Sequence, residues 1–267
     1  MKRTIALSVG NAPLTFFLPD TSWHSFIKKY YGPYLVPRSL RASPRIGIMQ
    51  LPSGSNGELS VDRDGGQWNI KRGDFTSRST ANFLSTELNI VKDRFSLNSW
   101  LRIFLSLYGA ARSQLLIHSA GYYHSGGVYL FPGRSGSGKS TITRLLGKDS
   151  ALSDELVIVS SGKNNVQASS TPFWGELKKG SGSIFTGPLR GIFFLRHGAG
   201  ISARRIDSGM GLRKLLPTVL FFSHDHATVS RVLALSAAFV KRLPAYELTF
   251  SLRNTRAEVI NCIEHAL

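Results

Sequence analysis

The sequence predicts a mixed α/β fold, in which a small β-rich lobe over residues 1–95 precedes a larger domain over residues 96–267. Three observations support this prediction. Short apolar runs broken by Gly, Pro, Asn and Ser fill the first segment, which is typical of β-hairpins. From Ser96, apolar residues recur three and four positions apart, as on one face of a helix. A glycine-rich segment over residues 133–141 then lies between an apolar run and an amphipathic run, which indicates a strand, a loop and a helix.

Composition limits the class of protein. The chain has 267 residues, of which 42% are hydrophobic and 18% charged, and this is typical of a globular protein with a sizeable core. The single cysteine, Cys262, excludes an internal disulfide and a cysteine-based metal cage, which favours a reducing compartment. No apolar run approaches the roughly 18 to 20 residues that cross a bilayer. We therefore expect a soluble, cytoplasmic protein without a membrane span.

The formal net charge is +17, from 33 Lys plus Arg against 16 Asp plus Glu. Such an excess favours an anionic partner, which could be nucleic acid, an acidic protein or peptide, or an anionic membrane face. The basic residues are scattered in ones and twos, and no basic stripe interleaved with aromatic residues occurs. This pattern disfavours nucleic acid, and acidic or phosphorylated small ligands explain the charge equally well.

In the first lobe, we expect strands over residues 46–49, 59–61 and 67–70, with a turn at residues 64–66. A short helix is expected over residues 22–31, because its aromatic and aliphatic residues share one face. The acidic residues of the lobe stand among turn residues, where capping is the usual role. The lobe carries no catalytic constellation, so we expect either a small β-rich structural lobe or a platform for the substrate, and the sequence leaves its role open.

The second domain begins with a helix that Ser96 or Asn98 would cap. Apolar strands over residues 115–123 and 128–131 then flank a Ser-Gly-Gly turn, which predicts a hairpin. If the turn centres on its first two residues, position 118 lies opposite position 133, and His118 stands beside the start of the glycine-rich loop. A slip of one residue would turn His118 to the other face, where it would be an ordinary strand histidine.

The glycine-rich segment matches the phosphate-binding pattern G-x-x-x-x-G-K-[ST]. Backbone N–H groups of such a loop point inward at phosphate oxygens, and the positive end of the following helix faces them. Lys139 would reach the outer phosphates, and the Ser140 hydroxyl would be a ligand of Mg²⁺. The residues expected to bind the nucleotide are Gly133, Ser135, Gly136, Ser137, Gly138, Lys139, Ser140 and Thr141. The alternative is a glycine-rich hairpin loop that contains a lysine.

The helix after the loop is expected to end near Gly147, before a strand over residues 151–159. This strand carries the adjacent acids Asp154 and Glu155. Carboxylates beside an apolar strand are costly to bury without a cation, so they indicate a metal or a paired base. Side chains alternate on a strand, so at most one of the two can meet Ser140 unless the backbone bends. The alternative is a pair of acids at an exposed strand edge.

Beyond these acids we expect a turn over residues 160–165, an aromatic segment over residues 171–176 and a loop over residues 177–187 that could close over a substrate. A buried strand over residues 188–195 has Arg190 at its entrance, where it would contact phosphate or the transferring group. The alternative for Arg190 is a solvated position at the sheet edge.

The C-terminal part predicts helices over residues 211–220 and 227–243, a strand over residues 246–250 and a last helix over residues 255–265. The apolar run that ends at Asp225 is a weaker candidate for a second nucleotide motif, because Pro217 precedes it. Two histidines flank this aspartate, but no further ligands follow at the spacing of a zinc site.

Taken together, these residues resemble the HPr kinase/phosphorylase family, whose P-loop domain is similar to that of phosphoenolpyruvate carboxykinase. The chain is also similar to the HPr-kinase-related proteins of peptide-modification clusters, including lasso-peptide kinases. The resemblance spans residues 96–250 and rests on the segments 116–121, 130–141, 152–156, 171–176 and 188–191. The second acid of the pair is Glu where HPr kinases have Asp, and the later loop tied to dephosphorylation has no match, which argues against HPr as substrate and against phosphorylase activity.

The resemblance implies a role for each matching position. Asp154 would accept a proton from the attacking hydroxyl, with His118 close by to orient or tune this carboxylate, and Glu155 would hold Mg²⁺ together with Ser140. Arg190 would stabilise the transferring group. If Glu155 faces away from the metal, the two acids exchange roles.

The leading hypothesis is therefore an ATP- and Mg²⁺-dependent kinase that phosphorylates a hydroxyl, a serine of a peptide or protein, for which an acidic partner fits the basic charge. Three alternatives stay open: a small-molecule kinase, a catalytically weak nucleotide-binding module, and an ATPase associated with nucleic acid. The sequence leaves open the choice of ATP over GTP and whether the chain forms a homo-oligomer.

Overall fold

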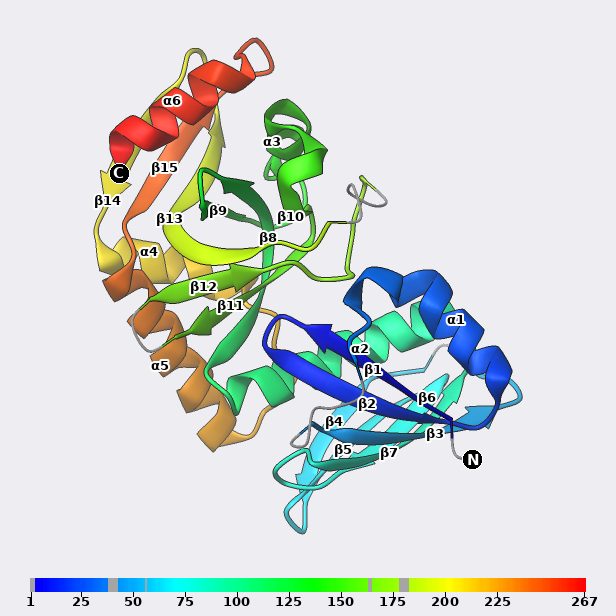
Figure 1. Cartoon of the computed structure of the whole chain (residues 1–267). Helices are drawn as coiled ribbons and strands as arrows, with labels where there is room; N and C mark the ends of the chain where they lie inside the picture. The colour runs from blue at the N-terminus through cyan, green and yellow to red at the C-terminus, as the bar shows by residue number, and fades with distance from the viewer. Residues whose placement is uncertain (1–2, 38–42, 56, 163–164, 178–182) are drawn as a thin grey trace. The chain divides into compact units, whose positions relative to one another are not determined.

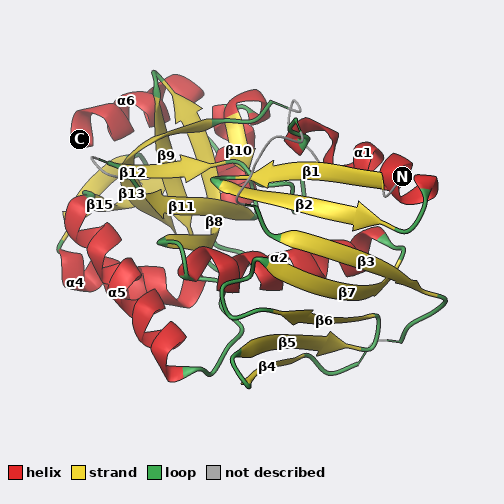
Figure 2. Cartoon of the chain, turned by 60° about the horizontal axis from the view of Figure 1, so that its bottom comes forward, coloured by secondary structure: helices red, strands yellow, loops and turns green. Residues whose placement is uncertain are grey.

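The computed structural model describes the chain except for residues 1–2, 38–42, 56, 163–164 and 178–182 (Figure 1). The fold is mixed α/β, as predicted, with sheets and helices in both of its compact units (Figure 2). The first unit comprises Met1–Arg112 and Phe221–Arg231, and the second comprises Ser113–Leu220 and Val232–Leu267. Among the described residues, no helix is both long and apolar enough to cross a membrane.

The first unit is built on a seven-stranded sheet in the order β1-β2-β3-β7-β6-β5-β4. Its β2–β3 and β3–β7 pairs are parallel and the others are antiparallel. Helices α1 (Thr21–Tyr31) and α2 (Arg94–Ala110) and a 3₁₀ helix (Gly32–Tyr34) complete the part before residue 113. The strands are β1 (Arg3–Val9), β2 (Ala12–Leu18), β3 (Arg45–Leu51), β4 (Ser60–Asp64), β5 (Gln67–Arg72), β6 (Phe75–Ser79) and β7 (Ser85–Val91).

Helix α2 belongs to the first unit, whereas the sequence analysis assigned it to the second domain with a boundary at residue 95. Its Trp100 packs edge-on against Phe16 with ring centroids 6.5 Å apart, and the Trp100 indole N–H donates to Ser77 Oγ at 2.8 Å. Burial against the sheet therefore decides where the helix belongs, and neither position 96 nor 98 caps it. The N-cap is Asp93, whose carboxylate accepts from the backbone N–H groups of residues 95 and 96.

The second unit has an eight-stranded sheet in the order β10-β8-β11-β12-β13-β15-β14, with β9 pairing both β8 and β13. The helices are α3 (Lys139–Leu146), α4 (Ser208–Leu215) and α6 (Arg256–Ala266), with 3₁₀ turns at Lys148–Ser150 and Leu216–Thr218. Helix α5 (His226–Arg242) begins in the first unit and belongs to the second from Val232 onward. The strands are β8 (Gln114–His124), β9 (Gly127–Pro132), β10 (Ala151–Ser153), β11 (Leu156–Ser161), β12 (Val166–Ser169), β13 (Thr186–His197), β14 (Ser202–Ile206) and β15 (Ala245–Phe250).

The predicted hairpin and its register are confirmed. In the β8–β9 pair, Ser119 lies opposite Pro132 and His124 opposite Gly127. The same register continues one residue further, to His118 and Gly133, because the backbone N–H of Gly133 donates to the carbonyl of His118 at 3.1 Å. The hairpin therefore brings the imidazole of position 118 to the entrance of the glycine-rich loop.

One hydrophobic core anchors both flanks of that loop. It contains Phe131 of β9, before the loop, and Ile142 of α3, after it, together with residues of β8, β13, β15 and α6. Phe193 and Tyr246 stack at its centre with rings 5.0 Å apart and nearly parallel. Since the strand and the helix share this core, the loop between them is held at both ends.

The predicted strand over residues 151–159 is interrupted. The backbone bends at Asp154 and Glu155, between β10 and β11. Parts of the turn expected at 160–165 and of the loop expected at 177–187 lie outside the described residues, and β13 begins at Thr186, inside that loop.

The C-terminal elements follow the prediction with one shift. Helix α4 ends at Leu215 instead of continuing to residue 220, because Pro217 has no N–H to donate and stands in a 3₁₀ turn. Helix α6 begins with a capping box in which Thr255 and Glu258 exchange hydrogen bonds with each other's backbone N–H.

A buried carboxylate on β15 makes the free energy of unfolding depend on pH. Glu247 is paired with Lys214, Arg204 and Arg196, and these bonds lower its pKa to about 2. Because the folded-state pKa is depressed, the stabilisation is present above pH 4.5 and is lost as the pH falls towards 2. We expect Glu247→Gln to lower the free energy of unfolding by about 2 kcal/mol at pH 7, a value reduced for the exposure of the cations. Urea denaturation at pH 7 and pH 4 should show the difference shrinking with acidity, and an equal difference at both values would contradict it.

Candidate functional site

A polar hollow of about 280 Å³ in the second unit is lined by most of the glycine-rich motif, over residues 135–141. It lies where β9 passes into α3, and residues from β8, the bend before β11 and the end of β13 also reach it. The lining residues are His118, Ser135, Gly136, Gly138, Lys139, Ser140, Thr141, Asp154, Glu155, Gly175, Glu176 and His197.

The loop turns tightly at positions that favour or require glycine. Gly136 and Gly138 have φ values of 79° and 97°, in the left-handed region that favours glycine. At Gly133, a Cβ would stand 2.2 Å from Ser137 Oγ, so any side chain there would collide with the loop. Helix α3 begins at Lys139 and directs its N-terminal end at the hollow. These features explain three of the motif glycines by geometry.

Lys139 is buried at the base of the hollow. Its ammonium donates to the carbonyl oxygens of Gly133 and Arg134, each at 2.9 Å. Burial lowers the pKa of Lys139, and the charges of Asp154, Glu155 and Glu176 act in the opposite direction. The ammonium is therefore held inside the loop, close to a cluster of carboxylates.

One polar atom of the loop is buried without a partner. Ser137 Oγ has no hydrogen-bond partner among the described residues. Leaving a buried hydroxyl unpaired costs roughly 1 to 3 kcal/mol. A phosphate oxygen in the loop would be a suitable acceptor, so this orphaned group fits an anionic ligand.

We expect Ser137→Ala to raise the nucleotide-free protein's free energy of unfolding by about 1 kcal/mol, because the unpaired hydroxyl is removed. The same change should weaken triphosphate binding several-fold. Chemical denaturation without ligand and calorimetric titration with ATP would measure the two effects. Ser135→Ala, at an exposed position of the same loop, is the matched control for the change in stability. A variant less stable than the parent would show that the hydroxyl is not an orphan.

Asp154 is buried and its carboxylate is fixed by the segment that follows β12. Oδ1 accepts from the backbone N–H of Gly175 at 2.8 Å, and Oδ2 accepts from that of Leu177 at 3.0 Å. The Ser140 hydroxyl lies 3.5 Å from Oδ2. The site thus places a carboxylate beside the hydroxyl expected to ligate a metal.

Glu155 also lines the hollow, because the backbone bends where the sequence analysis expected a straight strand. Its carbonyl accepts from Ser119 N–H at 3.0 Å, and the next residue, Leu156, pairs with His118 in the β8–β11 ladder. The bend therefore allows both acids and the histidine to face one space.

The oxygen donors fit Mg²⁺. Ser140, Asp154 and Glu155 offer one hydroxyl and two carboxylates, and Mg²⁺ bound with a nucleotide ordinarily uses one or two carboxylates together with phosphate oxygens. Within the described part of the chain, no group of three or more His, Cys, Asp or Glu side chains that could hold a metal occurs.

Two ionisable residues, Glu176 and His197, line the hollow but have no role predicted from the sequence. Glu176 forms an ion pair with Arg144 of α3 at 3.1 Å, and its position in the aromatic segment was the only signal for it. His197, at the end of β13, lies against the loop, since a Cβ on Gly138 would stand 3.1 Å from its ring. Its ring is 5.7 Å from that of Phe250. No local pattern marks position 197, because long-range strand pairing brings it there.

Arg190 is not part of this hollow. Its side chain packs against Gly127, where an added Cβ would lie 2.5 Å from it. Strand β13 runs parallel to β9 with Leu189 beside Val128, so position 190 matches the start of β9, whereas the phosphate loop follows its end. The structure therefore places Arg190 outside the hollow, and the predicted contact with the transferring group is not found.

Asp225, the weaker candidate for a second nucleotide motif, lies in the first unit. Its carboxylate accepts from the backbone N–H of Thr228 at 2.9 Å and pairs with Arg63 at 3.6 Å. It therefore serves as a helix cap at the start of α5.

No protein-family model matches this chain, and a search of curated proteins found no match either. The geometry of the hollow is therefore the basis for assigning a function.

Proposed function

We propose that this protein is an ATP- and Mg²⁺-dependent kinase with an HPr-kinase-like P-loop fold, and that it transfers the γ-phosphoryl group to a hydroxyl, a serine of a peptide or protein. The observation that carries the proposal is the 3.5 Å approach of the Asp154 carboxylate to the Ser140 hydroxyl, beside the Lys139 ammonium. This combination of a cradle, a cation and an oriented carboxylate is what phosphoryl transfer requires.

In the proposed mechanism, the loop amides and Lys139 bind the β- and γ-phosphates. The ammonium, now bonded to two loop carbonyls, exchanges these acceptors for phosphate oxygens. The Ser137 hydroxyl gains the acceptor that it lacks. Binding in this way neutralises charge on the phosphates and lines the γ-phosphorus up with the acceptor.

The two acids divide between the metal and the proton. The short distance to Ser140 and the two hydrogen bonds from backbone N–H groups support Asp154 as the carboxylate that holds Mg²⁺. The two acids thus exchange the roles that the family resemblance implies, in which Asp154 is the base and Glu155 the metal ligand. Mg²⁺ would draw charge from the β- and γ-phosphate oxygens. Glu155 then accepts the proton of the acceptor hydroxyl as its oxygen bonds to the γ-phosphorus and ADP departs, and His118 helps to orient the acceptor.

The direct test is transfer of label from γ-labelled ATP. The full chain with Mg²⁺ is incubated with a panel of serine peptides, acidic and basic, and in parallel with small hydroxyl compounds. Labelled peptide that disappears when EDTA is added supports the proposal. Label in a small compound alone would reassign the acceptor, and ATP that is bound yet never consumed would favour a nucleotide-binding module.

A further inference from the structure

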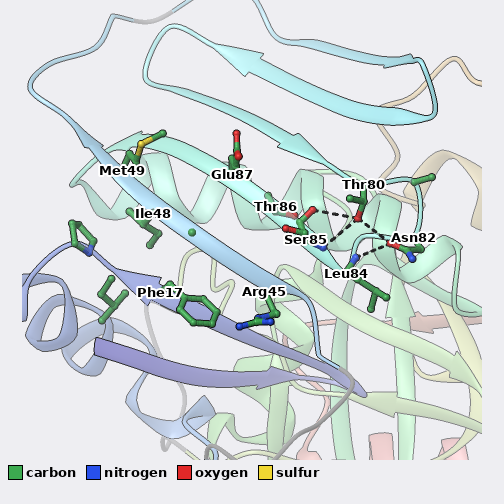
Figure 3. Close-up of a pocket in the computed structure, with 14 residues that line it drawn as sticks. Phe17, Arg45, Ile48, Met49, Thr80, Asn82, Leu84, Ser85, Thr86 and Glu87 are labelled. Carbon is green, nitrogen blue, oxygen red and sulfur yellow. Dashed lines mark hydrogen bonds between the residues drawn. The ribbon is translucent and has the colours of Figure 1, made fainter. Parts of the chain in front are cut away.

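The seven-stranded sheet of the first unit has a second, larger hollow of about 1120 Å³ (Figure 3). It is lined by residues of β2, β3 and β7 and of the turn before β7. On β3, Ile46 and Ile48 are buried, whereas Arg45 and Met49 are exposed. The hollow therefore lies on the outward face of the sheet, opposite the side chains that form the core.

The centre of this hollow is a glycine. Gly47 lies in register between Phe17 of β2 and Glu87 of β7. A Cβ added to Gly47 would meet nothing closer than a carbonyl oxygen at 3.9 Å. The fold does not require glycine at this position, and glycine in a strand interior costs stability. What glycine provides here is open space between its neighbours.

The walls of the hollow hold large apolar side chains in solvent. Met49 is 54% exposed and Leu84 is 43% exposed. Leu84 follows Phe83, a bulky residue with φ of 60° whose ring stacks on Trp68 at 5.9 Å and is fully buried. Such a backbone conformation costs on the order of 1 kcal/mol and persists only where packing enforces it. The core thus holds Leu84 at the rim.

A cation marks one end of the hollow. The Arg45 guanidinium lies over the Phe17 ring at 5.1 Å, and no carboxylate among the described residues pairs with it. The acid of the hollow, Glu87, stands directly opposite Arg78 in the β6–β7 register. Figure 3 shows Arg45 and Phe17 on one side of β3 and Glu87 on the other. An acidic group on a ligand therefore has a cation available at this end.

We propose that this hollow binds an extended acidic and apolar segment of the peptide acceptor, apart from the residue that is phosphorylated. The identity of that peptide as the acceptor rests on the proposed function. Arg45, Gly47 and Met49 follow one another at every second residue, about 7 Å apart along the strand. An extended peptide alongside them places an acid at one position and apolar side chains two and four residues away. The net charge of +17 also favours an acidic partner.

The first test measures binding without nucleotide, so its outcome is separate from that of any kinase assay. The probe is the fluorescein-labelled heptapeptide Thr-Glu-Thr-Leu-Thr-Phe-Thr, titrated with the full chain and followed by fluorescence anisotropy. Gly47→Ile fills the hollow with a good strand former, so it should stay folded and bind at least about tenfold more weakly. Thr76→Ile, on the same face of β6 but outside the hollow, is the matched control and should bind like the parent.

The second test exchanges charges. Arg45→Glu should bind the probe about tenfold more weakly, and replacing the glutamate of the probe with lysine should restore binding to this variant. Equal binding of both probes by parent and variant would overturn the proposal. Displacement of the probe by lipid vesicles would also overturn it, since a membrane would then be the occupant. A dimer that sedimentation velocity detects for the parent but not for Gly47→Ile would overturn it too, since a second copy of the chain would then fill the hollow.

Discussion

Replacing Asp154 with asparagine is expected to lower the rate of phosphoryl transfer roughly 1,000-fold while ATP binding changes little. The neutral amide keeps the shape of the side chain, but it can accept from only one of the two backbone N–H groups, that of Gly175 or that of Leu177, and it loses the charge beside Ser140. Lys139 and the loop amides, which would hold the triphosphate, are untouched. Steady-state rates and calorimetric titration with ATP measure the two halves of this prediction.

A magnesium titration identifies which role the charge has. If Asp154 holds the metal, the residual rate of Asp154→Asn should rise with Mg²⁺ concentration, whereas Glu155→Gln should show a loss that added Mg²⁺ does not relieve. Asp149→Asn, the same chemical change at an exposed position, is the matched control. Transfer by Asp154→Asn at the parental rate would remove the observation on which the proposed function depends.

Replacing Lys139 with methionine is expected to weaken ATP binding about 100-fold and to abolish measurable transfer, since the cation that faces the outer phosphates is lost. Methionine retains the length and apolar character of the buried stem. The loop carbonyls of residues 133 and 134 lose their donor, so the loop should also become less ordered. Titration with ATP, and separately with AMP, distinguishes the lost phosphate contact from a general collapse, because AMP lacks the outer phosphates.

Lys148→Met is the control for this change, since it removes a lysine at an exposed position after α3. It should bind ATP like the parent. Retained ATP affinity in Lys139→Met would indicate that the motif is a glycine-rich turn without a nucleotide role.

Much of the site was predictable because its parts are local in sequence. The phosphate-loop pattern, the apolar strand before it and the helix after it lie within about 20 residues, and all three are found in the structure as predicted. The position of His118 followed from the turn at residues 125–127, since a short hairpin loop determines the register of both strands.

Other features depended on contacts between distant segments. The bend that allows Asp154 and Glu155 to face one hollow is stabilised by N–H groups more than 20 residues away, at Gly175 and Leu177. The apolar pattern of residues 151–159 predicts one continuous strand, on which two adjacent side chains point to opposite faces. Its place at the entrance of an apolar strand predicted a phosphate contact for Arg190. The parallel alignment of β13 with β9 instead places Arg190 near the start of β9, whereas the glycine-rich loop follows the end of β9.

By itself, the sequence determined the mixed α/β class, the phosphate-binding motif and the elements around it, because capping, turn chemistry and side-chain periodicity act over a few residues. Only the tertiary structure decided that α2 belongs to the first unit and that both acids face the glycine-rich loop. It also decided that His197 reaches Gly138 and that Gly47 leaves an open hollow on the first sheet. These features arise from strand pairing and burial between segments far apart in the chain, and no local pattern encodes which segments will meet.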